Sequence, residues 1–517
     1  MTNPSIPRID YGLSRARPRV LQDFPFRTLM IGLKTASATA TSGELVLQED
    51  ADDVLQVVES FGEGSMLSYG YQVFREINDR SELDFLPIDD AGTQATATIL
   101  YSGASTQECT HSVTSVSNRD FRKSVNVLSG QTAAEIATEV FNQFDGIYNA
   151  PFTVADDGNG TLTFTAVSGG SLPNDWLLSY SGNISGVTIT LTEWNGGSGD
   201  PNVANILDAI PNDRQYDRYI WPSSFDIQEV RNFLDNREQV FNRIVSGVAL
   251  STKEDTLNNL KTYASGINSK NVCILGLTSF VNTSYIGNNV QEDPYAITCN
   301  LAAQTALRFE DKASLSRIVS AGVNDIDLRG GIQAATMPYH NLRIRSFSAG
   351  APEGSYFTDL EQVELEAGGI STLGRDDSSS IGSIYGEIVT TKGANVNGDV
   401  EFLNRIDTER TIQKYVFYNF KRAYRQTRLT EGDLVTGATI VNADLIRSTM
   451  TRWYGDLADK AITQKGYDAE GIFSDSLEII VNTCDGSVQI SFEAPVVGQL
   501  RNAIIDQITI FCRQELA

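Results

Sequence analysis

The sequence predicts a multidomain chain of mixed α/β and α+β class, and three observations lead to this prediction. The chain has 517 residues, which is too long for one hydrophobic core, so roughly three or four domains are expected. Its middle part alternates apolar strand patterns with helical patterns, and an earlier stretch is rich in Thr, Ser and Gly with a period of two. Its last part predicts helices followed by strands, which is typical of an α+β domain.

The N-terminal part predicts an extended arm and then the first part of a core domain. Residues 1–25 are rich in Pro and Arg and have weak periodicity, so they cannot make a core alone. Residues 26–87 begin the core domain. The elements predicted there are a strand at 27–33 and helices at 52–60 and 66–78. Glycines at 61–65 end the first helix, and Ser65 is placed to cap the second.

Residues 88–200 predict an inserted β-rich module of α+β type. Their composition shifts to Thr, Ser, Gly and alternating apolar residues. The predicted strands are 97–101, 152–154 and 161–166, with one helix at 132–144. The turn Asp156-Asp157-Gly158-Asn159-Gly160 joins the last two strands, and a glycine-rich flexible link at 195–199 ends the module.

Residues 201–350 predict the main α/β part of the core domain. Apolar strands at 218–221, 245–250 and 272–276 alternate with helices at 227–243, 253–265 and 294–309, which indicates a largely buried sheet. Residues 351–410 are polar and predict an irregular connecting region. Residues 411–517 predict a C-terminal α+β domain, with helices near 409–428 and 442–463 and strands at 477–481, 487–493 and 503–512.

The terminal strands favour an unfinished sheet. Val488, Ile490 and Phe492 alternate with polar residues, a period of two that gives a half-buried strand. Two or three strands alone make a marginal sheet with open edges, and open edges recruit partners. We therefore expect strand exchange between subunits. The alternative is an ordinary sheet completed by strands from elsewhere in the same chain.

Composition and charge exclude several classes of protein. The net charge is −25, from 40 basic and 65 acidic side chains, and such a surface repels the phosphates of nucleic acids. No run reaches the roughly 18 apolar residues that a membrane span needs, and the first residues lack a secretory signal. The five cysteines are scattered without metal-type spacing, which favours free thiols in a reducing compartment.

The sequence gives little support for catalysis, and no enzyme activity, cofactor or metal is expected. His111 and His340, the two histidines, have no nucleophile or ligand pattern beside them, so we interpret both as structural or exposed. A phosphate-binding Gly-x-x-x-x-Gly-Lys-Ser/Thr loop does not occur. The turn at 156–160 superficially resembles a calcium loop, but Val167 stands at the twelfth position, where a bidentate Glu is needed.

The helix predicted at 409–428 has a basic stripe. At 100° per residue, the cations of this helix fall on one side: Lys414, Lys421, Arg422, Arg425 and Arg428. The opposite side carries Val416, Phe417, Phe420, Ala423 and Tyr424. Such a helix can bury its aromatic side and present its cations to an acidic partner. The alternative is an ordinary solvated helix face.

Several segments, in order along most of the chain, resemble Mu-like phage tail sheath proteins. The segment 50–67, with Phe61-Gly62-Glu63-Gly64-Ser65-Met66-Leu67, resembles the start of that family. Ala95-Thr96-Ala97-Thr98-Ile99 and the segment 130–137 resemble its inserted outer domain. Ile210-Pro211-Asn212-Asp213 and Tyr219-Ile220-Trp221-Pro222 resemble the opening of its α/β core, and the helix pair with the tail 495–510 resembles its C-terminal domain. The stretch 351–410 departs most from the pattern.

The resemblance implies a structural subunit of a contractile tail sheath, located in the virion after assembly in the cytoplasm of the host bacterium. Such subunits stack as hexameric rings around a tail tube, between baseplate and terminator proteins, and contract to drive the tube through the host envelope. The C-terminal domain faces the tube, so the basic stripe is expected there. Strands lent to neighbouring subunits complete that domain. The expected donors are Ile504, Ile505, Ile508 and Ile510 in the tail and Ile6, Ile9, Tyr11 and Leu13 in the arm.

Two other classes of protein remain as alternatives. One is a multidomain carbohydrate-binding adhesin in which the β-rich module binds the sugar. Its exposed aromatic residues would include Trp176, Tyr180 and Trp194, although Trp176 beside Leu177-Leu178 fits a core position better. The other is a hydrolase, which lacks a nucleophile–base pair.

Overall fold

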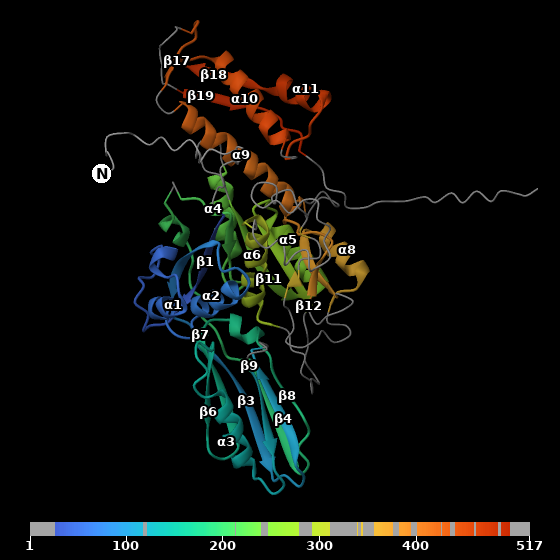
Figure 1. Ribbon diagram of the computed structural model, residues 1–517. Coiled ribbons are helices and arrows are strands. Elements are labelled where there is room, and N and C mark those ends of the chain that lie inside the picture. The colour runs from blue at the N-terminus through green and yellow to red at the C-terminus, as the bar shows by residue number, and fades with distance from the viewer. Residues whose placement is uncertain are drawn as a thin grey trace, which may run out of the picture. The chain divides into compact units, whose positions relative to one another are not determined.

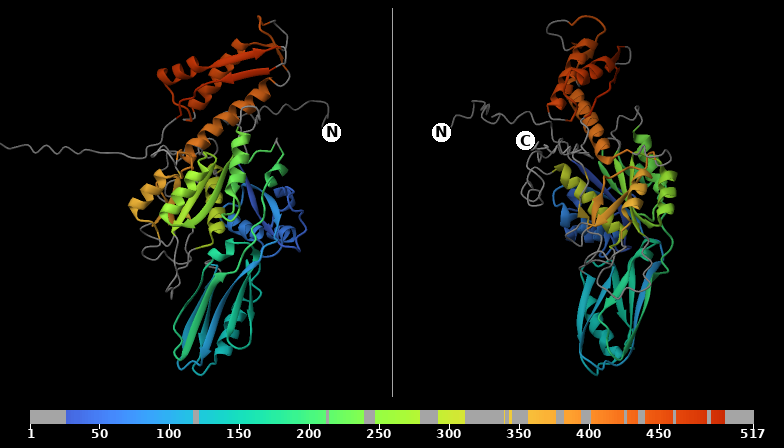
Figure 2. Two further views of the ribbon diagram at one scale, coloured as in Figure 1. Left: turned by 180° about the vertical axis from the view of Figure 1, so that it is seen from behind. Right: turned by 90° about the vertical axis from the view of Figure 1, so that its right-hand side faces the viewer.

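A computed structural model gives the architecture of the chain (Figures 1 and 2). It describes residues 26–116, 121–211, 214–238, 247–278, 292–310, 339, 343–344, 356–375, 382–393, 401–424, 427–434, 440–459, 462–483 and 487–496. The chain divides into two compact units. The first comprises residues 1–335 and 339–417, and the second comprises residues 336–338 and 418–517.

An eight-stranded sheet forms the centre of the first unit. Its spatial order is β13 (Arg343–Ile344), β15 (Gly382–Tyr385), β14 (Ile370–Arg375), β12 (Val272–Thr278), β11 (Val248–Asp255), β10 (Arg218–Ile220), β1 (Arg27–Lys34) and β2 (Glu82–Asp89). The six strands from β14 to β2 are parallel, and β15 and β13 add on antiparallel. Strands β1, β2 and β12 are buried along almost their whole length, as expected for a parallel sheet covered on both faces.

Two groups of helices cover this sheet (Figure 2). One group is α1 (Val54–Phe61), α2 (Met66–Ile77) and α6 (Pro294–Glu310), and the other is α4 (Ile227–Arg237), α5 (Leu257–Ile267) and α8 (Asp359–Ala367). The predicted cap of α2 is confirmed, because the Ser65 side chain accepts a hydrogen bond from the amide of Ser68 at 3.1 Å.

The inserted module contains two small sheets that enclose one core (Figure 1). The four-stranded sheet has the order β6 (Phe152–Asp156), β7 (Thr161–Gly169), β3 (Gln94–Gly103) and β9 (Val187–Asn195). The three-stranded sheet has the order β5 (Arg122–Val127), β4 (Cys109–Ser115) and β8 (Leu178–Ser181). Helix α3 (Ala133–Phe144) begins with a capping box between Thr132 and Glu135. Buried Phe144 packs edge-on against Phe164 at a centroid distance of 5.4 Å.

Asn149 fixes the module to the start of α2. Its side-chain oxygen accepts hydrogen bonds from the Gly64 amide and the Ser68 hydroxyl, both at 2.8 Å. Its side-chain nitrogen donates to the Ser68 carbonyl at 3.1 Å and to Gln72 Oε1 at 3.2 Å. Asn149 is buried and has φ 56°, a left-handed conformation that Asn tolerates better than most residues. One side chain therefore satisfies several buried polar groups where module and core meet.

Two local expectations are wrong. In its described parts the range 351–410 is not irregular, because those parts supply α8, β14, β15 and the first turns of α9 (Leu403–Tyr424). The polar segment at β14 forms a strand because β12 offers it a hydrogen-bonding edge. The segment 195–199 is not a free link. Its Gly197 exchanges two 2.9 Å hydrogen bonds with the Asn174 side chain, and Ser198 accepts a 2.7 Å bond from the Thr93 amide.

The second unit contains both helices and strands. It contains the end of α9, the short parallel pair β16 (Arg428–Leu429) and β17 (Ile440–Val441), helices α10 (Ala443–Ala458) and α11 (Tyr467–Ser476), and strands β18 (Glu478–Asn482) and β19 (Ser487–Ser491). Helix α11 lies in a segment where no helix was expected, and Gly466 stands at its N-cap without a side-chain bond.

Candidate assembly surfaces

The terminal hairpin of β18 and β19 is the first candidate surface. The strands pair antiparallel from Glu478↔Ser491 to Asn482↔Ser487. Their alternating apolar residues are half-buried on one side, whereas Ile480 on the other side is 49% exposed. Among the described residues this sheet has only two strands, so each strand keeps one edge without a ladder partner. A two-stranded ribbon is marginal alone, and its edges are suited to pairing with a further strand.

Aromatic stacking and hydrogen bonds hold this hairpin in the second unit. Phe473 of α11 stacks on Tyr454 of α10 at a centroid distance of 4.3 Å, and Phe492 packs edge-on against Phe473 at 5.5 Å. Arg447 of α10 donates a 2.8 Å hydrogen bond to the carbonyl of Leu477, just before β18. The hairpin therefore has a fixed base although its edges are open.

The chain that follows β19 returns toward the end of α10. The Gln464 amide donates to the Pro495 carbonyl at 2.7 Å, and the Gln464 side chain donates to the Val496 carbonyl at 2.9 Å. Beyond Val496 the chain lies outside the described residues. The same holds for all the expected donor residues, namely Ile504, Ile505, Ile508 and Ile510 in the tail and Ile6, Ile9, Tyr11 and Leu13 in the arm. Strand exchange thus stays a prediction.

Helix α9 connects the two units, and a buried ion pair clamps its first half to β10. Arg218 donates two hydrogen bonds to the Asp407 carboxylate, at 2.9 and 2.6 Å, and the Tyr339 hydroxyl donates a third at 2.6 Å. The side chains of Arg218 and Asp407 are 0% and 4% exposed. Burial alone would lower the pKa of Arg218, but the charge of Asp407 raises this pKa above its ordinary value. The pair is bidentate and stays charged.

Two cations of α9, Lys414 and Arg410, lie near this buried pair. Lys414 forms an ion pair with Asp217, whose other carboxylate oxygen accepts a 3.1 Å hydrogen bond from the Arg27 amide. Arg410 donates to Asn271 at 2.5 Å, and burial lowers its pKa. The first half of α9 is therefore a fixed part of the core domain.

The structure changes the membership of the predicted basic stripe. Lys414 is 8% exposed and ion-paired, so its assignment to an outward-facing stripe is wrong. Arg428 is exposed but lies in β16, because the helix predicted to reach residue 428 ends at Tyr424. Arg422 is exposed on α9, and the side chains of Lys421 and Arg425 lie outside the described residues. The helical projection failed at Lys414 because α9 crosses from one unit to the other at residue 417, so that its two halves have different surroundings. On the opposite side, Phe417 is 37% exposed.

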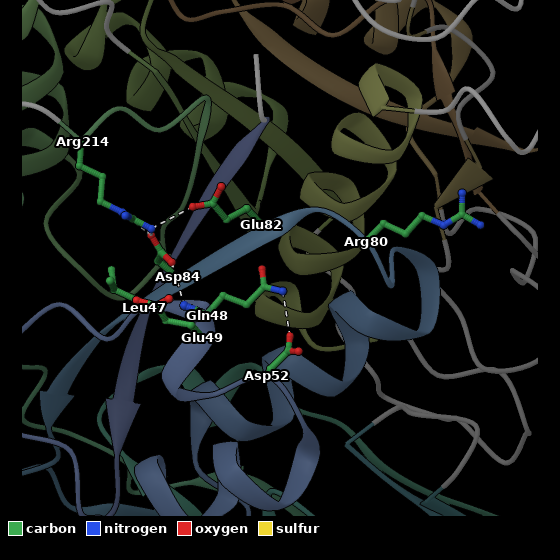
Figure 3. Close-up of a pocket in the computed structure, with 8 residues that line it drawn as sticks. All are labelled: Leu47, Gln48, Glu49, Asp52, Arg80, Glu82, Asp84 and Arg214. Atoms are coloured by element: carbon green, nitrogen blue, oxygen red, sulfur yellow. Dashed lines mark hydrogen bonds and ion pairs between the residues drawn. The ribbon is translucent and has the colours of Figure 1, made fainter. Parts of the chain in front are cut away.

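A polar hollow of about 440 Å³ lies beside the edge strand β2 (Figure 3). Within it, Arg214 contacts Glu82 at 2.9 Å and donates to Asp84 at 2.7 Å. The fully buried Asp84 also accepts hydrogen bonds from the Gln48 amide at 3.0 Å and the Tyr216 hydroxyl at 2.6 Å. Arg214 thus neutralises the carboxylates of Glu82 and Asp84, so we interpret this group of charges as structural. No group of three His, Cys, Asp or Glu side chains in the described parts of the chain is arranged to hold a metal ion.

The residues weighed for catalysis or metal binding have structural roles where the structure describes them. His111 is buried, and its ring nitrogens lie 3.0 Å from the Tyr101 hydroxyl and 3.0 Å from the Gly182 carbonyl. Burial lowers the pKa of His111, so the ring is neutral at pH 7. His340 lies outside the described residues. The carboxylate of Asp157 accepts bonds from the amides of Asn159 and Thr161 at 2.7 and 2.9 Å, which confirms a hairpin turn.

The aromatic residues proposed for an adhesin do not form an exposed sugar-binding surface. Trp176 and Trp194 are 5% and 3% exposed and pack edge-on at a centroid distance of 5.2 Å. Tyr180 is half-buried and packs against His111. Tyr180 lies on β8 and Trp194 lies on β9, whereas Trp176 lies two residues before β8. The two tryptophans are therefore core residues and do not offer a sugar-binding surface. Among the helices that the structure describes, none is both long and apolar enough to cross a membrane.

Sequence reasoning missed the Arg218–Asp407 clamp. One signal was present, since Arg218 is the first residue of the strand predicted at 218–221, next to the apolar residues Tyr219, Ile220 and Trp221. A buried guanidinium requires a carboxylate partner. The identity of that partner, 189 residues away, could not be read from the sequence.

Comparison with curated proteins confirms the resemblance to Mu-like tail sheath proteins. Over 191 residues the chain is 29% identical to the Mu-like prophage FluMu tail sheath protein of Haemophilus influenzae. The match covers 36% of this chain and 38% of that relative, so it spans less than two fifths of either protein. No protein-family model matches the chain.

Two solved structures are also similar to the chain. The first is the sheath tail protein of Desulfitobacterium hafniense, with a TM-score of 0.44 and 14% identity over 93% of this chain and 95% of that one. The second belongs to the anti-feeding prophage baseplate, with a TM-score of 0.33 and 11% identity over 59% of this chain and 71% of that one.

Proposed function

We propose that this chain is a structural subunit of a contractile tail sheath. In this proposal, subunits polymerise as stacked hexameric rings around a tail tube and contract to drive the tube through a host cell envelope. The partners are further copies of the chain, the tube protein, and baseplate and terminator proteins, and the chain acts in the virion without enzymatic activity. The observation that carries the proposal is the match to the FluMu tail sheath protein.

The terminal hairpin supports this function by offering a place where another copy can add a strand. A strand of five residues, the length of β18, adds a few main-chain hydrogen bonds to an open edge. Each bond contributes about 0.5–1.5 kcal/mol net, so the added strand contributes on the order of several kcal/mol. A link of this kind holds neighbouring subunits together while their domains rotate, which contraction requires. The donors in this proposal are the N-terminal arm and the C-terminal tail.

The clamp on α9 supports a mechanical role for the connecting helix. Because buried ion pairs hold its first half to β10, the helix cannot slide along the core domain. The exposed Arg422 and Arg428 lie beyond the clamp, where we place the surface that meets an acidic tube. The adhesin alternative loses its support, since Trp176 and Trp194 are buried.

Negative-stain electron microscopy of the purified protein tests the proposal. A sheath subunit forms hollow, striated cylinders, whereas an adhesin or an enzyme gives discrete particles. Discrete particles alone, at every protein concentration and in the presence of the cognate tube, would contradict the proposal.

A further inference from the structure

Helix α8 has two apolar faces, of which the fold uses only one. Leu365 is fully buried and Gln362 is 2% exposed, and this side packs on β14. On the other side, Leu360 is 84% exposed and Val363 is 56% exposed. Ala367 follows at the next turn and is also exposed. The spacing i, i+3, i+7 places these three residues on one stripe along the helix. Scattered single apolar residues are ordinary on a surface, but a stripe marks a contact surface.

Acidic residues border this stripe. Asp359 is exposed in the first turn of α8, and the side chain of Glu364 is 52% exposed although it contacts Lys261 at 2.5 Å. An apolar stripe with a negative border fits a surface that combines an apolar residue with a cation.

Helix α10 of the second unit presents such a surface. Leu445 is 39% exposed, and Ser448 and Arg452 are exposed on the same side, again with the spacing i, i+3, i+7. Arg452 lies seven positions after Leu445, and Ala367 lies seven positions after Leu360, which is roughly 10 Å along each helix. The two stripes therefore have the same length.

We propose that α8 of one copy of this chain docks antiparallel on α10 of a second copy. This orientation brings Arg452 to Asp359 at one end and Leu445 to Ala367 at the other. The small Ser448 lies opposite Val363 and lets the helix backbones approach closely. The inference rests on the proposed function because it requires the chain to polymerise, and it adds a helix-to-helix contact to the strand exchange.

A charge exchange between two variants tests this contact. Asp359→Arg and Arg452→Asp, each alone, place like charges at the contact, and each raises the protein concentration needed for polymerisation. The expected rise is about tenfold, equivalent to about 1.4 kcal/mol. An equimolar mixture of the two variants restores polymerisation, because each opposed pair in alternating copies is again an Arg with an Asp. The readouts are sedimentation and light scattering against concentration.

An apolar variant and its matched control complete the experiment. Leu360→Glu disrupts the stripe and raises the critical concentration by at least about tenfold. Leu128→Glu, at a 53% exposed leucine of the inserted module, adds the same charge elsewhere and leaves polymerisation unchanged. Circular dichroism of each variant checks that it is folded.

The outcomes separate this inference from the proposed function. If the wild type polymerises and the single variants do so equally well, or if the mixture is not restored, the α8–α10 contact is wrong and the sheath function stands. If Leu128→Glu has the same effect as Leu360→Glu, added charge alone explains the loss and the contact is again wrong. If the wild type stays monomeric even with the cognate tube, the proposed function fails together with this inference.

Discussion

Removing one member of the buried clamp on α9 should destabilise the first unit strongly. Asp407→Asn keeps the shape of the side chain but leaves the guanidinium of Arg218 buried without a counter-charge. Breaking a buried ion pair from one side costs about 3–5 kcal/mol. Coulomb's law agrees, since charge centres roughly 4 Å apart at an effective dielectric constant of about 20 interact with about 4 kcal/mol. The geometry justifies the upper part of this range, because two hydrogen bonds at 2.9 and 2.6 Å join side chains that are almost fully buried.

Urea unfolding followed by tryptophan fluorescence measures this effect. Trp221, which directly follows β10 and is fully buried, reports on the core. The matched control is Glu409→Gln on the same helix. That carboxylate contacts Arg405 at 3.4 Å with side chains 41% and 62% exposed, so its loss costs at most about 1 kcal/mol. The double variant Arg218→Met with Asp407→Leu should regain much of the loss, because it removes both buried charges. A loss below about 1 kcal/mol for Asp407→Asn would refute the reasoning.

Four further predictions concern the module junction, a buried carboxyl group and the two assembly surfaces. Asn149→Ala leaves several buried polar groups without partners, so it should cost about 1–3 kcal/mol and expose the junction to proteolysis; an unchanged digestion pattern would contradict this. Burial, with a contribution from the charge of Asp175, raises the pKa of Asp293 from 3.8 to about 6. As the pH rises, the unfolded chain loses this proton before the folded chain does, so the free energy of unfolding should fall between about pH 4 and about pH 6. In urea titrations across this range, Asp293→Asn should make that fall smaller. An unchanged dependence on pH would show that Asp293 is not its source. Deletion of residues 1–25 should leave a folded chain that does not form long tubes; long tubes would show that the arm does not link subunits. Lys421→Glu with Arg425→Glu should weaken assembly on the tail tube but spare tube-free polymers. Unchanged assembly on the tube would show that these two cations do not face it.

The sequence predicted most elements with strong periodicity. The alternation of Val488 and Ile490 predicted β19, and its pairing with β18 is confirmed. The strand–helix alternation of residues 201–350 predicted a largely buried sheet, to which this range contributes β10, β11 and β12. In both cases local pattern and tertiary environment agree, since the residues that set the period are the ones that the fold buries in the core sheet and half-buries in β19.

The elements that were missed depend on partners distant in the sequence. Strand β2 contains Asp84, which looks unfavourable in a buried strand until Arg214 and Tyr216 supply its hydrogen bonds. Strand β14 is short and polar, and it forms because β12 lies beside it.

Candidate surface residues were harder to predict than elements, for the same reason. A helical projection orders residues around the axis of α9, but it does not say what surrounds each turn. The projection therefore placed Lys414 and Arg422 on the same exposed face. In the structure Lys414 is buried in an ion pair with Asp217, which comes from another part of the chain, whereas Arg422 is exposed.

The most direct test of the central claim is a cryo-electron microscopy map of the assembled protein at a resolution that traces main chains. The account predicts that the edges of β18 and β19 carry further strands, and that these strands continue into the N-terminal arm or C-terminal tail of neighbouring copies. A map in which both ends of each chain pair only with their own subunit, or in which the hairpin keeps two strands, would contradict it.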